Sequence, residues 1–231
     1  MSEKEIKRAS EPFRFYTRLN LTELTGLSAS NLKELLGCLK EVPGSSIYHH
    51  THRFLQQHQY LSPEPPNDFA YWVHNVLGEK ELGERLASID TIGFNNIGDL
   101  RMEFISVIEN YIKENASAGT KFANKDDALY FMKSISFIFP TSYVAYDLKG
   151  FLDGLKNITI DSIYFHIFES RLRLAKGTND FSKWISETIG DSKLANDISK
   201  LDPYSYTLDE LRDRIIKLTE RRLEGLNGKD R

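Results

Sequence analysis

Two histidines at matching places are the residues best suited to chemistry in this chain. His50 ends the stretch SIYHH, and His166 ends the similar stretch SIYFH. Imidazole titrates near neutral pH and can exchange a proton or ligate a metal. One interpretation is a shared pocket that takes one His from each stretch and binds a metal or an anion. The other is a half-buried ring with an internal hydrogen-bond partner, which is how most buried polar groups are satisfied.

A catalytic pairing of each His with the Asp of its own stretch is not expected. Asp68 and Asp180 follow Asn67 and Asn179, and these Asn-Asp pairs are typical of a helix N-cap. If the capped helix runs back antiparallel, its first residue lies about 12 Å from the His along the axis. A pairing between the two stretches remains open.

The predicted ligand-binding residues also include two tyrosines and two arginines: Tyr48, Tyr164, Arg101 and Arg212. The tyrosines lie two residues before the repeated His and would line the shared pocket. The arginines lie in the first turns of expected helices, where a positive charge opposes the helix dipole. A structural ion pair with the preceding Asp90 or Asp202 is one explanation, and anion binding is the other.

A metal site and a catalytic residue are not predicted. The cluster His49, His50, His52 and His58 has no Cys beside it and no carboxylate at a recognised ligand spacing. His49 and His52 correspond to Phe165 and Phe168 in the second stretch. The nucleotide-binding and hydrolase motifs that can be read from sequence are absent, so no cofactor is assigned.

Both stretches belong to a longer internal repeat that suggests gene duplication. Positions match at a shift of 116 from Phe15 to His50, of 112 around Trp72 and Trp184, and of 111 at Arg101. The changes in shift fall between expected helices, as duplication of a folded unit predicts. The predicted domains are a first repeat at 13–115 and a second at 128–225, which can share one core.

The elements that must position these residues are mostly helices. Leu32, Leu35, Leu36 and Leu39 recur at helical spacing, with Ser28 or Ser30 as the N-cap. About five such helices per repeat predict an all-α fold, a helical bundle of two similar lobes packed about a pseudo-two-fold axis.

Strands are expected to be short and minor. The segments Phe13–Tyr16 and Leu129–Phe139 read either as short strands or as buried helix segments, which periodicity cannot separate. Several helix ends are clearer. Thr207 and Glu210 predict a capping box, and Gly78 and Gly190 are placed where a helix ends in a left-handed residue.

Composition excludes several classes of protein. A net charge of -3 argues against a nucleic-acid binder, and no apolar run is long enough to cross a membrane. Cys38 is the single cysteine, and its counterpart Gly154 suggests only a small residue on a helix. The charged start of the chain and the lone cysteine predict a cytoplasmic protein.

The pattern S-I-Y-x-H, N-D-F-x-x-W and D-P-Y-x-x-T-L-x-E-L-R, best kept in the second repeat, resembles an uncharacterised prokaryotic family catalogued only as a domain of unknown function. The resemblance covers about Phe13 to Leu218. It implies a cytoplasmic bacterial or archaeal protein and no particular activity.

Two hypotheses of function follow. The first is a non-enzymatic binding or adaptor protein that uses the groove between the repeats to hold a protein partner or a small ligand. The second is a small-ligand or metal-binding sensor, or an enzyme, with a composite site formed by His50 and His166. Enzymatic activity is therefore left open, and the first hypothesis is preferred because no complete catalytic constellation is visible.

Overall fold

The computed structural model describes residues 7–53, 67–91, 93–170, 178–201 and 205–227. They form two compact units. Unit 1 comprises residues 7–19 and the described residues from 137 to 227, and unit 2 comprises the described residues from 20 to 136. The chain therefore begins in unit 1, builds unit 2, and then returns to complete unit 1.

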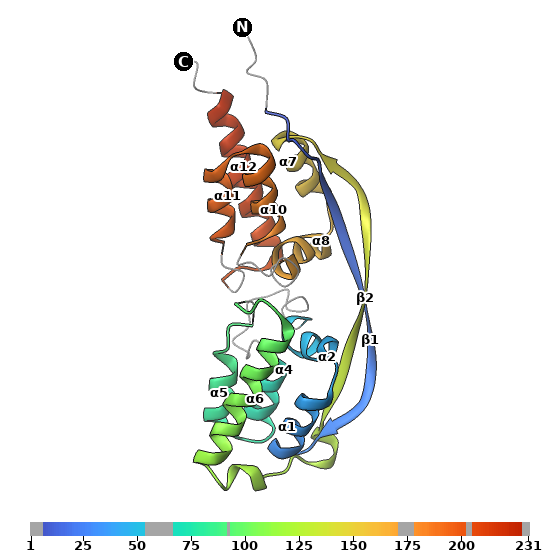
Figure 1. Cartoon of the computed structure of the whole chain (residues 1–231), viewed down its shortest axis with the longest axis vertical. Helices are drawn as coiled ribbons and strands as arrows, with labels where there is room; N and C mark the ends of the chain where they lie inside the picture. Colours follow the sequence, from blue (N-terminus) through green and yellow to red (C-terminus); the bar gives the residue numbers. More distant parts are fainter. Residues whose placement is uncertain (1–6, 54–66, 92, 171–177, 202–204, 228–231) are drawn as a thin grey trace. The chain divides into compact units, whose positions relative to one another are not determined.

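Two long strands show that the predicted all-α fold is wrong. β1 (Phe13–Ala29) and β2 (Leu129–Ala145) have 17 residues each and form a two-stranded sheet, which we call the ribbon (Figure 1). Each strand lies partly in unit 1 and partly in unit 2, because the boundaries fall at Leu19 and Ser136. The ribbon is a main element of the fold and not the minor feature expected.

Cross-strand contacts define an antiparallel register. The Thr25 hydroxyl donates to the Phe131 carbonyl at 2.8 Å, near the start of β2. The Thr141 hydroxyl donates to the Phe15 carbonyl at 2.9 Å, near the start of β1. Each strand thus ends beside the beginning of the other.

The strands escaped the sequence analysis for a physical reason. A half-buried strand is recognised by alternation of apolar and polar residues, which reflects one buried and one solvated face. In β1 the residues from Leu19 to Leu24 are exposed or half-buried. This segment therefore has no buried face that would require apolar and polar residues to alternate. The pairing partner is also more than 100 residues distant. Local windows therefore indicated at most short strands at Phe13–Tyr16 and Leu129–Phe139, and neither their length nor their pairing.

The helices of unit 1 follow β2. In chain order they are α7 (Leu148–Asn157), α8 (Ile160–Tyr164), η4 (Phe165–Glu169), α10 (Asp180–Trp184), η5 (Ile185–Ile189), α11 (Ser192–Ser199) and α12 (Leu208–Asn227). The segments η4 and η5 are π-helical turns that continue α8 and α10 without a break. Such turns widen a helix locally and are frequent at functional sites.

The helices of unit 2 lie between the two strands in the sequence. They are α1 (Leu32–Glu41), α2 (Gly44–Tyr48), η1 (His49–Arg53), α4 (Asp68–Asn75), α5 (Lys80–Ala87), α6 (Ile97–Glu114) and the short 3₁₀ turns η2 (Ala118–Thr120) and η3 (Lys125–Asp127). As in unit 1, a π-helical turn, here η1, continues the helix that carries the SIY sequence.

Most local predictions of helix ends are confirmed. The predicted capping box is present, with the Thr207 N–H donating to Glu210 at 2.9 Å and the Glu210 N–H donating to Thr207 at 3.2 Å. Gly78 and Gly190 have φ of 67° and 77°, as expected for left-handed helix ends. The N-cap predicted for α1 was wrong, because Asn31 caps this helix instead of a serine.

The core of each unit includes an aromatic ring from the ribbon. Phe15 is fully buried in unit 1, where its ring stacks on Phe151 at 5.8 Å. Phe131 is fully buried in unit 2, with its ring 6.0 Å from that of Phe69. Both rings lie near the start of a strand whose later residues continue into the other unit. Each set of helices therefore packs on a strand segment that is distant in sequence.

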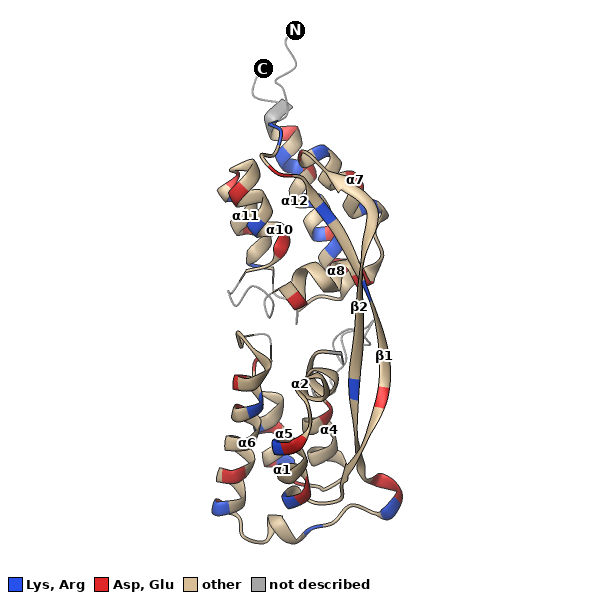
Figure 2. Cartoon of the chain, turned by 45° about the vertical axis from the view of Figure 1, so that its right-hand side comes forward, with Lys and Arg blue, Asp and Glu red and all other residues tan. Residues whose placement is uncertain are grey.

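The ribbon and the helices differ in charge. Lys, Arg, Asp and Glu are spread over the helices, while the ribbon carries fewer of them: Arg14, Arg18 and Glu23 in β1 and Lys133 in β2 (Figure 2). Within the described residues, no helix combines the length and the apolar character required to cross a membrane.

Candidate functional site

His166 in η4 is held on both sides by hydrogen bonds. Its Nδ1 lies 2.8 Å from Oδ2 of Asp180, and its Nε2 accepts the backbone N–H of Tyr16 in β1 at 2.9 Å. Because Nε2 accepts, the ring is neutral and its proton lies on Nδ1. Ser162, one helical turn earlier, donates to the Tyr16 carbonyl at 2.6 Å. We call Ser162, His166 and Asp180 the unit 1 clamp.

The same contacts recur in unit 2. Nδ1 of His50 lies 2.8 Å from Oδ2 of Asp68, and Nε2 accepts the backbone N–H of Met132 in β2 at 3.0 Å. Ser46 donates to the Met132 carbonyl at 2.7 Å. We call Ser46, His50 and Asp68 the unit 2 clamp. Each clamp satisfies both backbone groups of one residue at the edge of a strand.

The prediction that each His is distant from the Asp of its own stretch was wrong. It assumed that the helix after the SIY helix begins at the far end of that helix. Instead, α10 begins beside His166, and α4 begins beside His50. The prediction that each Asn-Asp pair supplies a helix N-cap is confirmed, and the structure assigns the cap to Asn67 and Asn179, whose side chains accept backbone N–H groups at 2.8 Å. The neighbouring Asp is thereby left to bind the imidazole.

The clamps limit the chemistry that the two histidines can perform. The rings of His50 and His166 are 3% and 2% exposed, and each nitrogen already has a partner. In this arrangement neither ring can ligate a metal or take up a proton without breaking the clamp. The hydrogen bond from backbone N–H to Nε2 also distinguishes these pairs from a catalytic dyad, in which that nitrogen faces the substrate.

The other histidines of the first stretch are engaged elsewhere. Nδ1 of His49 lies 3.1 Å from the hydroxyl of Ser134, and Nδ1 of His52 lies 2.8 Å from that of Thr51. His58 lies outside the described residues. No group of three or more His, Cys, Asp or Glu side chains in the described part of the chain is placed to hold a metal.

The two tryptophans each bind a backbone carbonyl just before the start of a ribbon strand. Both are buried in the cores, as predicted, with exposures of 4% for Trp72 and 7% for Trp184. The Trp184 indole N–H also donates to the Glu11 carbonyl at 2.8 Å, and that of Trp72 donates to the Asp127 carbonyl at 2.7 Å. The repeated S-I-Y-x-H and N-D-F-x-x-W residues therefore hold a ribbon strand on the helices.

The predicted tyrosines and arginines have different partners from the histidines. Tyr48 stacks on His52 at 5.3 Å, and Tyr164 stacks on Phe168 at 5.1 Å. The tyrosines are 7% and 1% exposed and belong to the cores. The structure therefore gives them packing contacts, while the clamp histidines bind the strands.

Arg101 and Arg212 hold the ends of other helices. Arg101 donates to the Val42 carbonyl at 2.8 Å, at the C-cap of α1. Arg212 reaches the carbonyl at the C-cap of α7 at 3.4 Å and pairs with Asp209 at 2.6 Å. The expected pairing of Arg101 with Asp90 is replaced by this carbonyl, because the end of α1 offers unpaired acceptors. Asp202 lies outside the described residues.

Cys38 is a structural thiol, as the sequence suggested. It lies in α1 with 8% exposure, and its Sγ is 3.6 Å from the Ser28 carbonyl. Burial raises the pKa of the Cys38 thiol, and the charges of Glu41 and Glu34 raise it further. A thiol that resists ionisation is a poor nucleophile.

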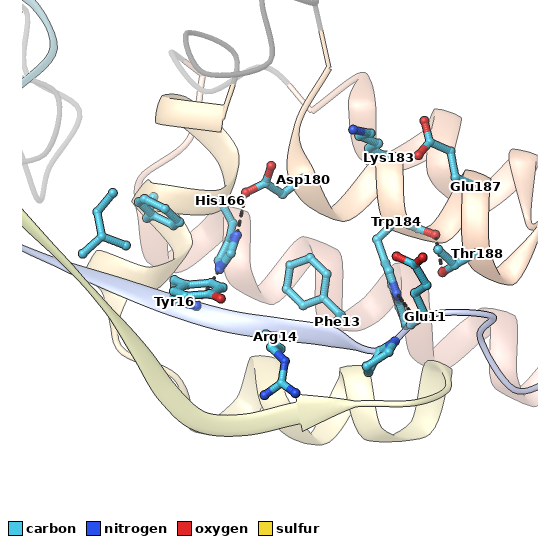
Figure 3. A pocket seen from close by; sticks show the side chains of 13 residues that line it. Glu11, Phe13, Arg14, Tyr16, His166, Asp180, Lys183, Trp184, Glu187 and Thr188 are labelled. Carbon is cyan, nitrogen blue, oxygen red and sulfur yellow. Dashed lines mark hydrogen bonds and ion pairs between the residues drawn. The ribbon is translucent and has the colours of Figure 1, made fainter.

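A groove of about 530 Å³ opens beside the unit 1 clamp, and we call it the β1 groove. It lies along the start of β1 and the helix formed by α10 and η5, with the His166–Asp180 pair at one end (Figure 3). Aromatic rings from both sides line it: Phe13, Tyr16, Phe165 and Trp184. Its volume and aromatic walls are in the range of small-ligand and peptide sites.

The rim of the β1 groove carries charges of both signs. Arg14 and Lys183 are its cations, and Glu11, Glu187 and Asp180 are its carboxylates. Asp180 is held by the clamp, but none of the other four side chains forms an ion pair with a described residue. Unpaired charges of opposite sign at the mouth of an aromatic groove suit a ligand that carries both signs.

Of the six predicted ligand-binding residues, only His166 lines this groove. The sequence analysis missed Arg14, Lys183 and Glu187 because it followed positions that agree between the repeats. Arg14 matches Tyr130 at the shift of 116, and Lys183 matches Tyr71 at the shift of 112. The sequence signal that could have identified these residues was therefore a difference in residue type between matched positions.

Unit 2 contains a buried carboxylate with two partners. Glu79 accepts a hydrogen bond from the Tyr111 hydroxyl at 2.7 Å and pairs with Lys121 at 2.8 Å. Burial alone would raise the pKa of Glu79, but these two partners hold it below its ordinary value. Burial and the Glu79 carboxylate together raise the pKa of Tyr111 to about 12.

Fold and site together define a mixed α/β protein in which two helical units are each clamped onto a shared two-stranded ribbon. The chain belongs to the family of unknown function DUF5752, whose sequence profile matches residues 10–220. This confirms the resemblance to an uncharacterised family. The solved structure of OrfY from Thermoproteus tenax is similar over 93% of this chain and 96% of that chain, with a TM-score of 0.77 and 27% identity. No curated protein sequence matches significantly.

Proposed function

We propose that this protein is a non-enzymatic binding protein and that the β1 groove is its ligand site. One observation carries the proposal: Arg14 and Lys183, which form no ion pair with any described residue, line a groove walled by aromatic side chains. Charged groups exposed beside apolar surface give both affinity and orientation to a ligand. A cytoplasmic location is part of the proposal, since a lone cysteine suits a reducing compartment.

The clamp beside the groove supports binding over catalysis. His166 has the side chain of the groove whose ordinary pKa is nearest to neutral pH, and both of its nitrogens are engaged. Its hydrogen bond to Tyr16 also fixes the strand that forms one wall. The clamp therefore supplies a rigid wall, and rigid walls lower the entropic cost of binding.

We further propose that the chain arose by internal duplication of repeats 13–115 and 128–225. The matching contacts of the two clamps support this origin. After duplication, residues needed for strand clamping stayed in both copies, while the rim residues Arg14 and Lys183 differ from Tyr130 and Tyr71. A ligand site that is present in one copy explains this divergence.

Trp184 provides a direct test, because its ring lines the groove. In the Trp72→Phe variant Trp184 is the only tryptophan, so its fluorescence reports on the groove. We expect at least one compound in a panel of amino acids, sugar phosphates, nucleotides and short peptides to change this emission saturably. Adding Lys183→Glu is expected to weaken that binding at least tenfold, while Lys193→Glu, an exposed position outside the groove, leaves it unchanged.

Two results would contradict the proposal. One is a panel in which no compound changes Trp184 emission or the melting temperature of the wild-type chain. The other is turnover of any panel compound that is lost in His166→Ala while circular dichroism remains native. The second result would establish an enzyme instead.

A further inference from the structure

The edge of β1 that faces away from β2 can be assigned residue by residue. In a strand, the backbone groups of successive residues point alternately to the two edges. The Phe15 carbonyl accepts a hydrogen bond from Thr141 of β2, while both backbone groups of Tyr16 bind the unit 1 clamp. Arg14 is two residues from Tyr16, so its N–H and C=O point to the same free edge.

On both sides of Arg14, the chain has backbone groups that form hydrogen bonds with the helices. Towards the chain start, the Ser10 N–H donates to the Thr188 carbonyl at 3.3 Å, and the Glu11 carbonyl accepts from Trp184. Pro12 has no N–H to satisfy. On the other side the clamp occupies Tyr16. Among the described residues, the helices provide no partner for the N–H and C=O of Arg14, which line the β1 groove.

An open backbone pair between two clamped points is a template for one more strand. Edge N–H and C=O groups bind extended chains by continuing the hydrogen-bond ladder, with side-chain pockets giving specificity. The distance from Glu11 to Tyr16 along an extended strand is about 16 Å, which matches about five residues of peptide. A compact small molecule satisfies both groups of Arg14 less readily than a peptide backbone does.

The charges follow an order along this edge. Asp180, Lys183 and Glu187 are three and four residues apart, so they lie on one face of the helix in successive turns. Asp180 marks the Tyr16 end, where it binds the clamp histidine, and Trp184 marks the Glu11 end. The cations of the rim therefore lie between the two ends, and unpaired carboxylates lie towards Glu11.

We propose that the ligand of the β1 groove is a short extended peptide that pairs with the N–H and C=O of Arg14. An acidic side chain of the peptide faces Arg14 and Lys183, and a basic side chain or an N-terminal amine faces Glu11 and Glu187. Apolar side chains of the peptide pack on Phe13 and the neighbouring rings. This inference rests on the proposed binding function and specifies its ligand.

The test begins with a random nine-residue peptide library displayed on phage and selected on the immobilised full-length protein. Enriched peptides are synthesised with a fluorophore, and their dissociation constants are measured by anisotropy. We expect an acidic and a basic residue in the enriched sequences. Lys183→Glu is expected to weaken binding at least tenfold, whereas Lys193→Glu leaves it unchanged.

Two substitutions of Arg14 separate backbone from side-chain recognition. Arg14→Val removes the cation and keeps the N–H, while Arg14→Pro removes both. Proline is tolerated at a strand edge whose N–H is not used by the neighbouring strand. We expect Arg14→Pro to bind the peptide at least tenfold more weakly than Arg14→Val. Methylating single backbone nitrogens of the peptide gives the same test on the wild-type chain, and one position is expected to lose binding tenfold or more.

The outcomes separate this inference from the proposed function. Selected peptides that bind Arg14→Pro and Arg14→Val equally, and that tolerate methylation at every nitrogen, overturn strand addition. If no peptide is enriched but a small compound changes Trp184 emission, the peptide ligand is wrong and the binding function stands. If neither binds, both proposals fail.

Discussion

The two units hold their ribbon strands by the same contacts but differ at the positions that form the β1 groove in unit 1. The His–Asp distance is 2.8 Å in both clamps, and the backbone N–H to Nε2 distances are 2.9 Å and 3.0 Å. At the rim, Arg14 and Lys183 of unit 1 match Tyr130 and Tyr71 of unit 2, which are 53% and 43% exposed. The comparison teaches that the shared polar residues hold the strands, and it directs the search for a ligand site to the residues in which the units differ.

A second difference concerns a buried carboxylate at matching positions. In unit 1, Asp191 pairs with Arg222, whose charge is fixed. In unit 2, Glu79 is held by Tyr111 and Lys121, and Tyr111 can ionise. The two units therefore hold a buried carboxylate at matching positions with different partners.

The largest expected effect comes from the core rings that the ribbon supplies. Phe15→Ala and Phe131→Ala are each expected to lower the free energy of unfolding by about 3–5 kcal/mol, since a fully buried ring leaves a cavity. Amide hydrogen exchange is expected to rise first in α7–α12 for Phe15→Ala and in α1–α6 for Phe131→Ala. Faster exchange in α1–α6 for Phe15→Ala would contradict the assignment of Phe15 to unit 1.

The next effect comes from the clamps. His166→Ala and His50→Ala are each expected to cost about 2–3 kcal/mol, because a backbone N–H and a carboxylate lose a buried partner. Urea denaturation of both variants measures the loss, and similar values are expected because the clamp contacts match. If both variants keep nearly the wild-type free energy of unfolding but lose ligand binding, the histidines act on the ligand instead. A control outside the clamps, His74→Ala at a half-buried position, is expected to cost less.

A smaller, pH-dependent effect separates the two carboxylates. Glu79→Gln is expected to cost about 1–3 kcal/mol near neutral pH, because it removes a charged hydrogen-bond partner. The pKa of Glu79 is depressed in the fold, so its stabilisation is present above the ordinary value of 4.5 and is lost as pH falls through the folded value. The difference between wild type and Glu79→Gln is therefore expected to shrink in acid. A constant difference across the acid range would contradict the depressed pKa.

At alkaline pH the dependence of stability on pH has the opposite sign, because stability is expected to fall as pH rises. The pKa of Tyr111 is raised from 10.0 to about 12, so the neutral phenol stabilises the fold below pH 10.0 and this contribution is lost as pH rises towards 12. Tyr111→Phe is expected to remove this alkaline dependence. Thermal denaturation between pH 9 and pH 11, followed in both chains, checks the prediction; parallel curves would contradict it.

The smallest effect on stability is expected at the rims. Exchanging the rim residues of unit 2 for those of unit 1, as Tyr71→Lys with Tyr130→Arg, is expected to change the free energy of unfolding by less than about 0.5 kcal/mol, because both side chains are exposed. The reverse exchange in unit 1, Lys183→Tyr with Arg14→Tyr, is expected to be equally mild and yet to abolish ligand binding. Ligand binding that persists after the reverse exchange would contradict the idea that Arg14 and Lys183 give unit 1 a function that unit 2 lacks.

Local features of the fold were predictable because their causes are local. A helix is stabilised by contacts between residues three and four apart, so its apolar stripe, caps and glycine end can be recognised in a short window. The capping box at Thr207, the Asn67 and Asn179 caps and the burial of both tryptophans followed from such patterns. The predicted caps Ser28 and Ser30 lie three residues and one residue before the actual cap Asn31, and helix ends are the least certain part of such predictions.

The candidate site was less predictable because its parts are distant in sequence. The partners of His166 are Asp180, 14 residues away, and Tyr16, 150 residues away. Nothing near His166 identifies Tyr16 as its partner, since any strand residue offers the same backbone N–H. The repeat indicated which histidines matter, but not what they bind.

By itself, the sequence determined the helices, their caps and the matched positions of the histidines. Only the tertiary structure decided that β1 and β2 pair, that each unit takes a strand segment from a distant part of the chain, and that both imidazoles are used to hold it. The physical reason is that strand pairing and the satisfaction of buried polar groups are set by contacts between segments far apart in the chain. Such contacts have no local periodicity, so they become visible when the chain is folded.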